Sequence, residues 1–509
     1  MRLAVLAALG LVAGPALSQE AGAPLSAIDW LSQSLESTST GPAVVDEPPV
    51  ATSGAAPGIK VTPLDGPTGG ALGVLPPEVT GLPRDLWAGS DEETLVALIG
   101  SEHVETVPAL QDLLVTLMLA EAEPPRGGDG QALFFARVDK LLDLGALDAA
   151  QSLLESGDLL KPDAFRRWFD VTLLRGTESE ACAMLRSHPS LAPTVMSRVF
   201  CTARNGDWNA AALTLNTARA LGDVTSEEEL LLSRFLDPEF AEPEESLLPP
   251  ERPSPLVYRI NEAVGDLMPT AGLPLAFSYA DLRDTVSWRA QIEAAERLAR
   301  HGAVSENVLL EVYTAREPAA SGGVWDRAAA IQALDGAMQA GDVAEVAGAL
   351  GPAWAAMQEA GLEVPFARLY GEPLLGLDLG DKAGALVHRI ALLSPAFEAA
   401  ARAREPANAG ERVWQAVATG EVEGVEGPDS PSRAVLAGFG EAEVPVDLAA
   451  ALDEGRVGEA ILGAMELFQQ GLDGDRGAVS RGIATLRAAG QEDAARRAAL
   501  QFLLLDARA

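Results

Sequence analysis

Nine glycines recur along this chain at short helix-breaking junctions, and within each half of the chain their intervals fall between 30 and 40 residues. They are Gly145, Gly176, Gly206, Gly302, Gly341, Gly380, Gly420, Gly455 and Gly490. In six cases an alanine follows five residues later, where a second helix would press closest to the first: Ala150, Ala181, Ala211, Ala385, Ala460 and Ala495. This period is typical of stacked helical hairpins. The sequence therefore predicts an all-α protein built as an α-solenoid.

The segment 136–157, ARVDKLLDLGALDAAQSLLESG, illustrates one junction. An apolar stripe ends at Gly145, which adopts a left-handed backbone at lower cost than other residues. Apolar residues then recur at three- and four-residue steps, so that two helices can pack face to face. The two stripes are Val138, Leu141, Leu142 and Leu144, then Leu147, Ala150, Leu153 and Leu154.

A glycine followed five residues later by alanine resembles the middle of a tetratricopeptide-type repeat. The tryptophan and tyrosine of that repeat's first helix and the proline after its second helix do not recur here, so the repeat is a degenerate one. The segment 295–327 also resembles a stretch of exported, uncharacterised alphaproteobacterial proteins, some of which carry the label "antifreeze glycopeptide". This chain lacks the threonine-bearing tripeptide repeats that the label implies. The resemblance implies helical repeats that present a long surface to a partner.

The first residues have the features of a secretory signal peptide over 1–18. A single basic residue precedes an apolar run from Leu3 to Ala13, and Ala16 and Ser18 have the spacing that a signal peptidase recognises. We expect cleavage after Ser18 and a periplasmic mature protein. No other stretch is long and apolar enough to predict an integral membrane segment.

Residues 19–90 are rich in Pro, Gly, Ser and Thr and are predicted to be disordered or extended. Within them, residues 26–35 have capping-box spacing and predict a short amphipathic helix. Its apolar side chains are Ile28, Trp30, Leu31 and Leu35. A helix on a tether is a candidate partner-binding motif, and docking on its own protein is the alternative. Residues 59–87 predict an extended strap along the solenoid, with Trp87 pinning it to the first helix.

Six prolines and a cluster of acidic residues interrupt the helical pattern between Leu236 and Leu256, and no helix can run through them. We therefore expect an N-terminal helical-repeat arm at 91–236, a Pro/Glu-rich linker at 237–256 and a C-terminal helical-repeat arm at 257–509. The glycine intervals are near 30 residues before this break and 35 to 40 after it. The second arm is therefore expected to have longer helices or wider loops.

The chain carries 74 acidic and 37 basic residues, for a net charge of −37. Such a surface repels nucleic acid and anionic membranes, so both are poor partners, and we predict no nucleic-acid partner. A basic patch on another protein, or loosely held divalent cations, would be compatible with it. The alternative is that the acidic surface only keeps the protein soluble.

Cys182 and Cys201 are the only cysteines of the chain. A reversal of the chain between His188 and Pro193 would place them on antiparallel neighbouring helices, at disulfide distance. A disulfide suits an exported protein, whereas two buried free thiols are the alternative. A catalytic dithiol is not predicted, because the sequence has no CxxC motif.

Sequence motifs of catalysis are missing. The chain has no HExxH, no GxSxG, no phosphate-binding GxxxxGKS or GxxxxGKT, and no GxGxxG after a strand. Its four histidines are far apart in the sequence, and DGDRG at 473–477 lacks the third acid and the closing glutamate of a calcium loop. We predict no catalytic residue, no cofactor and no metal.

A second candidate recognition surface is the glycine-containing loop from Thr314 to Arg327. It combines Arg316, Trp325 and Arg327, and tryptophan and arginine are frequent binding hot spots. The alternative is that Trp325 starts the next helix and fills the groove between two repeats.

These features together predict a periplasmic, non-catalytic scaffold or adaptor that binds other envelope proteins through helical-repeat grooves. One alternative is a peptidoglycan hydrolase or its inactive relative, because helical superstructures occur in lytic transglycosylases. Those enzymes have a catalytic Glu beside a Ser, and the Glu245-Ser246 pair of this chain lies within the proline-rich linker, which cannot hold it rigidly. A second alternative is an accessory component of a periplasmic motor or secretion machine.

Overall fold

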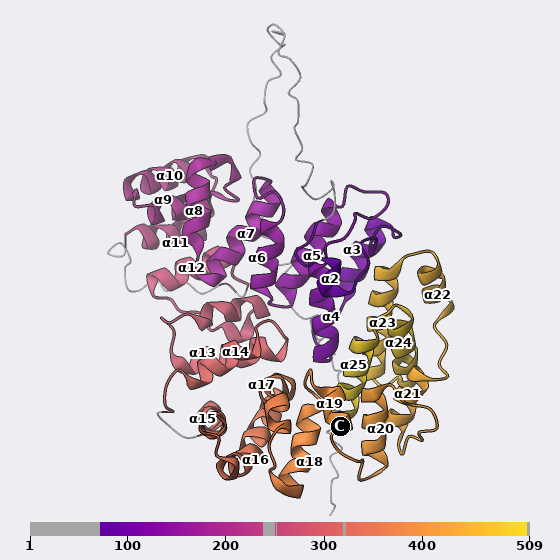
Figure 1. The fold of residues 1–509 in the computed structure, drawn as a ribbon. Helices are drawn as coiled ribbons and strands as arrows, with labels where there is room; N and C mark the ends of the chain where they lie inside the picture. Colours follow the sequence, from indigo (N-terminus) through magenta and orange to yellow (C-terminus); the bar gives the residue numbers. More distant parts are fainter. Residues whose placement is uncertain (1–71, 238–249, 251, 319–321, 506–509) are drawn as a thin grey trace, which may run out of the picture.

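The computed structural model describes residues 72–237, 250, 252–318 and 322–505, and it is an all-α protein (Figure 1). Within these residues no β-strand forms, and the strand-like pairings are isolated bridges such as the one between Leu72 and Ala122. The all-α class predicted from the glycine spacing is therefore confirmed. The predicted signal peptide at 1–18 and the predicted helix at 26–35 lie outside the described residues.

Short helices joined by tight turns make up the first half of the chain. They are α2 (Pro77–Thr80), α3 (Glu92–Ser101), α4 (Pro108–Leu119), α5 (Gln131–Asp143), α6 (Leu147–Glu155), α7 (Pro162–Arg175), α8 (Glu178–Ser187), the 3-10 turn η1 (Pro189–Leu191), α9 (Val195–Arg204), α10 (Trp208–Leu221) and α11 (Ser226–Leu236). Most of these helices pack against the helix that follows them in the sequence.

The second half begins after residue 252 and contains several longer helices. It comprises α12 (Pro255–Val264), the 3-10 segments η3 (Thr270–Gly272) and η4 (Leu275–Leu282), α13 (Trp288–Arg300), α14 (Glu306–Thr314), α15 (Val324–Ala340), α16 (Val343–Ala360), α17 (Glu363–Leu375), α18 (Gly380–Ala391), α19 (Phe397–Arg402), α20 (Ala409–Thr419), α21 (Ser430–Phe439), α22 (Val446–Asp453), α23 (Val457–Leu472), α24 (Arg476–Ala488) and α25 (Glu492–Leu505).

All nine glycines of the predicted series lie at helix boundaries with a positive φ, between 65° and 92°. At the end of α5, the backbone N–H of Gly145 donates to Leu142 and that of Ala146 donates to Leu141. These bonds use carbonyl groups that the helix itself leaves free, and α6 begins at once. The series missed further junctions of the same kind, such as Gly361 between α16 and α17.

The alanines that follow these glycines are buried in five of the six predicted cases, namely Ala150, Ala181, Ala211, Ala460 and Ala495. In each of these the helix begins two residues after the glycine, so the alanine is its fourth residue. The prediction is wrong for Ala385, which is exposed. Helix α18 begins at Gly380 itself, so Ala385 is its sixth residue and is rotated by about 200° to the other side of the helix.

Residues 72–90, which include the short helix α2, form a strap on the first helices. The sequence predicted a strap over 59–87, and its residues 59–71 lie outside the described residues. The guanidinium of Arg137 on α5 fixes the beginning of the described strap by donating to the carbonyl oxygens of Leu72, Met118 and Ala120, at 2.7–2.8 Å. Arg137 is 2% exposed. Burial lowers its pKa to about 10, so the guanidinium stays charged at neutral pH.

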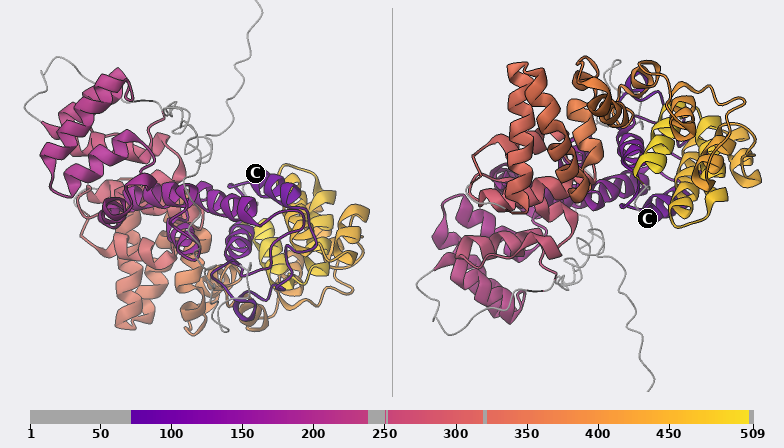
Figure 2. Two further views of the ribbon diagram at one scale, coloured as in Figure 1. Left: turned by 90° about the horizontal axis from the view of Figure 1, so that it is seen from above. Right: turned by 90° about the horizontal axis from the view of Figure 1, so that it is seen from below.

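The two ends of the helical array meet, which the repeat pattern did not predict. We use the term N–C junction for the contacts that residues 82–90, α3 and α4 make with α23 and α25. The backbone N–H of Gly458 on α23 donates to the carbonyl of Leu86 at 3.1 Å. The indole of Trp87 packs against Gly458 of α23, a contact that the sequence did not predict. Figure 2 shows the C-terminal helices beside the N-terminal ones from both sides.

Polar contacts on α4 strengthen the N–C junction. The side-chain oxygen of Gln501 on α25 accepts the backbone N–H of Ala109 at 2.8 Å, in the first turn of α4. This satisfies an N–H that the helix cannot pair itself. Asp112, one turn further on, forms ion pairs with Arg368 of α17 and Arg497 of α25. Both ends of the chain therefore contribute to one continuous hydrophobic core.

Contacts also join the two halves of the chain on the other side of the molecule. Helix α7 packs against α12 and against η4. The hydroxyl of Tyr279 in η4 donates to Asp148 of α6 at 2.8 Å, and Leu275 lies directly over Gly145.

Overpacking at Ala211 is the first testable consequence of the hairpin packing. Ala211 is fully buried between α9 and α10, so Ala211→Phe should destabilise the protein by about 1–3 kcal/mol, measured by chemical denaturation. Ala220→Phe changes an exposed position on the same helix and should alter stability by less than about 0.5 kcal/mol. Equal effects of the two substitutions would contradict this packing.

Candidate functional site

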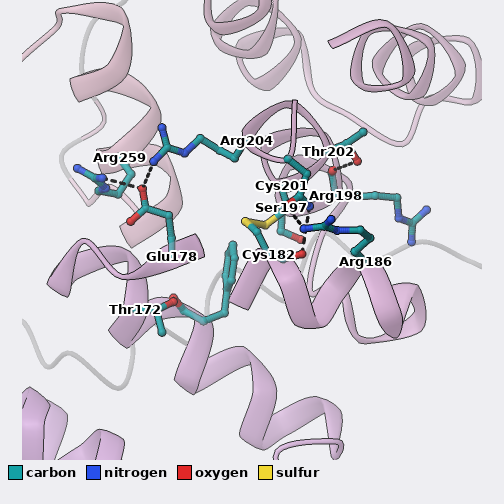
Figure 3. Close-up of a disulfide and its surroundings, with 12 residues drawn as sticks. Thr172, Glu178, Cys182, Arg186, Ser197, Arg198, Cys201, Thr202, Arg204 and Arg259 are labelled. Carbon is teal, nitrogen blue, oxygen red and sulfur yellow. Dashed lines mark hydrogen bonds and ion pairs between the residues drawn. A yellow bond between two sulfur atoms is a disulfide. The ribbon is translucent and has the colours of Figure 1, made fainter. Parts of the chain in front are cut away.

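The predicted disulfide is present and joins α8 to α9 (Figure 3). Cys182 and Cys201 have a Cα–Cα distance of 4.9 Å, and both are buried. The turn between the two helices contains η1, where the sequence predicted the reversal. The bridge therefore fixes the α8–α9 hairpin as a rigid unit.

A buried carboxylate lies beside this hairpin. Glu178, at the start of α8, accepts hydrogen bonds from Arg204 on α9 and from Arg259 on α12, each at 2.9 Å (Figure 3). Burial by itself would lower the pKa of Arg259, but Glu178 and Glu262 raise it overall. Glu178 thus connects the disulfide hairpin to the first helix of the second half of the chain.

Loss of the disulfide should measurably destabilise the protein. The Cys182→Ala, Cys201→Ala double variant is expected to lose about 2–4 kcal/mol, because the bridge limits the conformational freedom of the unfolded chain. Thermal unfolding with and without reductant measures the effect, and the double variant should not respond to reductant. Ser187→Ala with Ser190→Ala, at exposed positions of the same hairpin, is the matched control. An unchanged melting temperature in the cysteine variant would contradict the prediction.

The predicted recognition loop near Trp325 is largely occupied by internal contacts. Trp325, on α15, packs against Trp288 of α13 with ring centroids 5.1 Å apart. Arg327 donates two hydrogen bonds to the carboxylate of Glu296, each at 2.7 Å. Arg316 is exposed at the end of the described part of the loop. The contacts of Trp325 correspond to the alternative in which this side chain fills a groove between helices.

Glu296 is the centre of a buried polar cluster between α13, α14 and α15. It also accepts the hydroxyl of Tyr313 at 2.8 Å. Burial, and then the negative charge of Glu296, raises the pKa of Tyr313 well above its ordinary value, so the phenol stays protonated and keeps donating. Arg327 therefore positions helices here, and its guanidinium is not directed at solvent.

The other predicted partner-binding side chains, Ile28, Trp30, Leu31 and Leu35, lie outside the described residues. Their role stays a prediction.

Two buried acidic side chains, Glu102 and Asp170, were not predicted as functional residues from the sequence. Glu102, at the end of α3, is buried, which raises its pKa to about 8; nearby Lys140 opposes this shift and Glu466 of α23 adds to it. Burial also raises the pKa of Asp170 on α7 to about 7, against the influence of Arg166 and Arg167. Carboxyl groups that titrate near neutral pH are what a general acid requires. No sequence motif marks either residue.

Neither carboxyl group opens into the cavity found at the strap. This cavity has a volume of about 260 Å³ and is lined mainly by apolar side chains and small residues. Its lining residues are Leu72, Gln131, Phe134, Ser156, Gly157, Asp158, Lys161 and Ala164. Asp158 and Lys161 are the charged residues there, and both lie on the solvent side. The cavity and the two perturbed carboxyl groups are therefore separate features.

The fold and these sites define a helical-hairpin protein with a closed array. Comparison with protein-family models, with curated proteins and with solved structures found no match to this chain. Among the described residues, no helix is long and apolar enough to cross a membrane. The same residues contain no group of three or more side chains placed to hold a metal ion.

Proposed function

We propose that the protein is a periplasmic, non-catalytic scaffold that binds other proteins of the cell envelope through the outer faces of its helices. The observation that carries this proposal is that the buried charged side chains bind other parts of the same protein. The groups described above join helices that are distant in the sequence: Arg137 to the strap, Glu178 to Arg259, Glu296 to Arg327, and Asp112 to Arg368. Their polar groups are engaged in fixing the shape of the array.

A fixed shape favours binding, because less conformational entropy is lost when a rigid surface meets its partner. The N–C junction and the disulfide both restrict the conformations that the helical array can adopt. The acidic composition makes nucleic acid and anionic membranes poor targets and leaves proteins as the partner class. The signal-peptide features of residues 1–18 support an envelope location.

Crosslinking in the periplasm followed by mass spectrometry tests the proposal. Cells producing the tagged full chain are treated with a short crosslinker, and the captured proteins are compared with those captured by an unrelated acidic periplasmic protein. A scaffold should capture a small, reproducible set of envelope proteins. Motor or secretion components in that set would assign the scaffold to one of those machines, and capture at the level of the control would contradict the proposal.

Peptidoglycan hydrolysis is the rival that needs its own test. The full chain is incubated with purified peptidoglycan, and soluble muropeptides are measured. Glu102→Gln and Asp170→Asn remove the two carboxyl groups with pKa values nearest to neutral. Release of muropeptides that either substitution abolished would overturn the non-catalytic assignment, whereas we expect no release from any of the three proteins.

A further inference from the structure

Helix α10 has an outer face that no other described helix covers. Its buried residues, Ala211, Leu215 and Ala218, lie on the side that packs against α9 and α11. The opposite side is exposed and consists of Asn209, Leu213, Asn216, Thr217, Ala220 and Leu221. We use the term α10 face for these six residues. Figure 1 places α10 at an edge of the molecule, in the group of helices that the disulfide stabilises.

The α10 face carries no charged side chain, and its leucines are unusually exposed for a surface helix. Leu213 is 68% exposed and Leu221 is 71% exposed. Trp208 at the start of the same helix lies outside the α10 face and packs its ring against Phe235 of α11. No other helix of the described chain carries more than one large hydrophobic residue that is exposed to this degree. Exposed apolar residues that gather on one surface of a protein mark interaction sites.

The charge around this face differs from that of the rest of the protein. Acidic residues make up 74 of the 509 residues, yet between residues 181 and 222 there is one, Asp207, against four arginines. Asp207 caps the first turn of α10. Acidic side chains return at Asp223 and in the first turn of α11, which bounds the region. A basic and neutral surface is therefore set into an acidic protein.

One arginine of this region is available to a partner. Arg204 is paired with Glu178, Arg219 with Glu229, and Arg186 donates to Asn205. Arg198, on α9, is exposed, and its guanidinium has no ion pair or hydrogen bond within the described residues. Figure 3 shows it extending away from Glu178 and Arg259. Arg198 thus lies on the helix that packs along α10, and it is the exposed arginine of this region whose guanidinium has no partner within the described residues.

The shape of the surface fits a helix. In an array of hairpins each hairpin packs against its neighbours and leaves its outer side open to a partner, and the α10 face is exposed in this way. Ala220 on the face and the half-buried Ala212 at its edge permit the close approach of about 8–10 Å between helix axes that such packing needs. Fourteen residues of α10 offer a strip about 21 Å long, enough for three to four turns of a partner helix.

We propose that the α10 face, together with Arg198, binds an acidic amphipathic helix of a partner protein. The apolar side of that helix would cover Leu213 and Leu221, and its carboxylates would pair with Arg198. This inference rests on the scaffold function proposed above and identifies where one partner binds and by which chemistry.

Site-specific photocrosslinking in cells tests it. Leu213 in the full chain is replaced by a photoreactive phenylalanine derivative, and Val446 of α22, which is 87% exposed and distant from α10, is the matched control position. Mass spectrometry then identifies the crosslinked peptide. We expect the Leu213 position to yield a peptide of another protein with acidic residues and apolar residues at three- and four-residue spacing, and the Val446 position to yield none.

A charge reversal supplies the second measurement. Arg198→Glu should lower the crosslinking yield at position 213 by about tenfold, as loss of a charge pair at an interface does. Arg289→Glu, at an exposed arginine of α13, should leave the yield unchanged. Both sites are exposed, so the fold should be retained, and circular dichroism checks this.

The remaining outcomes overturn the inference. A crosslink to residues 26–35 of the same chain, or to a second copy of it, would assign another occupant to the face. A captured peptide without acidic residues, an unchanged yield in Arg198→Glu, or a yield no higher than at Val446 would do the same. The scaffold function would survive these results if the intact chain still captured envelope proteins elsewhere, so the two proposals fail separately.

Discussion

Trp87→Ala is expected to lower the free energy of unfolding by about 3–5 kcal/mol, the range for truncating a buried aromatic side chain. Trp87 is fully buried, and it lies in the strap while the surface it covers belongs to α23. The loss of stability should therefore affect the strap and α23 alike. Denaturant titration measures its size, and hydrogen exchange should show faster exchange in both the strap and α23.

Gly458 allows the same contact to be tested from the other side. A Cβ atom at this position would overlap the indole of Trp87, so Gly458→Val should destabilise by about 1–3 kcal/mol through overpacking. In Trp87→Ala the added methyl groups would enter the vacated space. The double variant should consequently be more stable than the sum of the single effects predicts.

A matched glycine substitution separates this effect from helix propensity. Gly348 is inside α16, where an added Cβ meets no atom within 4 Å. Gly348→Ala should be neutral or stabilising by up to about 1 kcal/mol. Strict additivity of Trp87→Ala and Gly458→Val would contradict the direct contact between the strap and α23.

The hairpins were predictable because their signals are local. A glycine with positive φ and an alanine at the fourth position of the next helix act over a few residues, and the sequence contains both. The same rule failed at Ala385 because it counts from the glycine, whereas burial depends on where the helix starts. That start is set by the turn at residues 376–379, which has no comparable signal.

The N–C junction was not predictable, because its determinants are hundreds of residues apart. The sequence predicted that Trp87 pins the strap to the first helix, and it carries no signal for the contact of Trp87 with α23. Nothing in the sequence around Gly458 indicates that an indole packs against this residue. Periodicity describes how neighbouring hairpins stack and carries no information on whether the ends of the array meet.

The same limit applies to the candidate interaction surfaces. Arg327 was a reasonable binding residue by type, but its partner Glu296 is 31 residues away in sequence and is found only in the folded chain. The α10 face was missed, although the sequence carries its signal. The run from 181 to 222 with a single acidic residue is visible in a chain of net charge −37.

A pH dependence of stability is expected at the N–C junction, with Glu102 as its source. Lys140 of α5 and Glu466 of α23 are the charged groups that act on this carboxyl group. Lys140 also pairs with Asp143 at 3.7 Å, and His103 pairs with Glu466 at 3.5 Å. Lys140 directs its ammonium group to the backbone carbonyls of Gly100 and Glu102. The carboxyl group is thus buried near an ammonium group whose hydrogen bonds already go to backbone carbonyl oxygens.

The sign follows from the pKa of Glu102, which burial raises from its ordinary value of 4.5 to about 8. Between these values the folded protein binds the proton and the unfolded chain releases it. Stability should therefore fall as the pH rises from about 4.5 to about 8 and then become level. A shift of this size corresponds to at most about 5 kcal/mol, and we expect roughly half of that because the effective dielectric constant inside proteins screens buried charges.

Glu102→Gln keeps the shape of the protonated side chain and removes its titration. It should be more stable than the wild type at pH 8, nearly equal to it at pH 5, and without the downward slope between them in denaturant titrations. Glu466→Gln removes a neighbouring negative charge and should make the slope shallower. Glu345→Gln, on the exposed surface of α16, is the control and should keep the wild-type slope. A wild-type slope in Glu102→Gln would mean that the pH dependence of the N–C junction arises from another group.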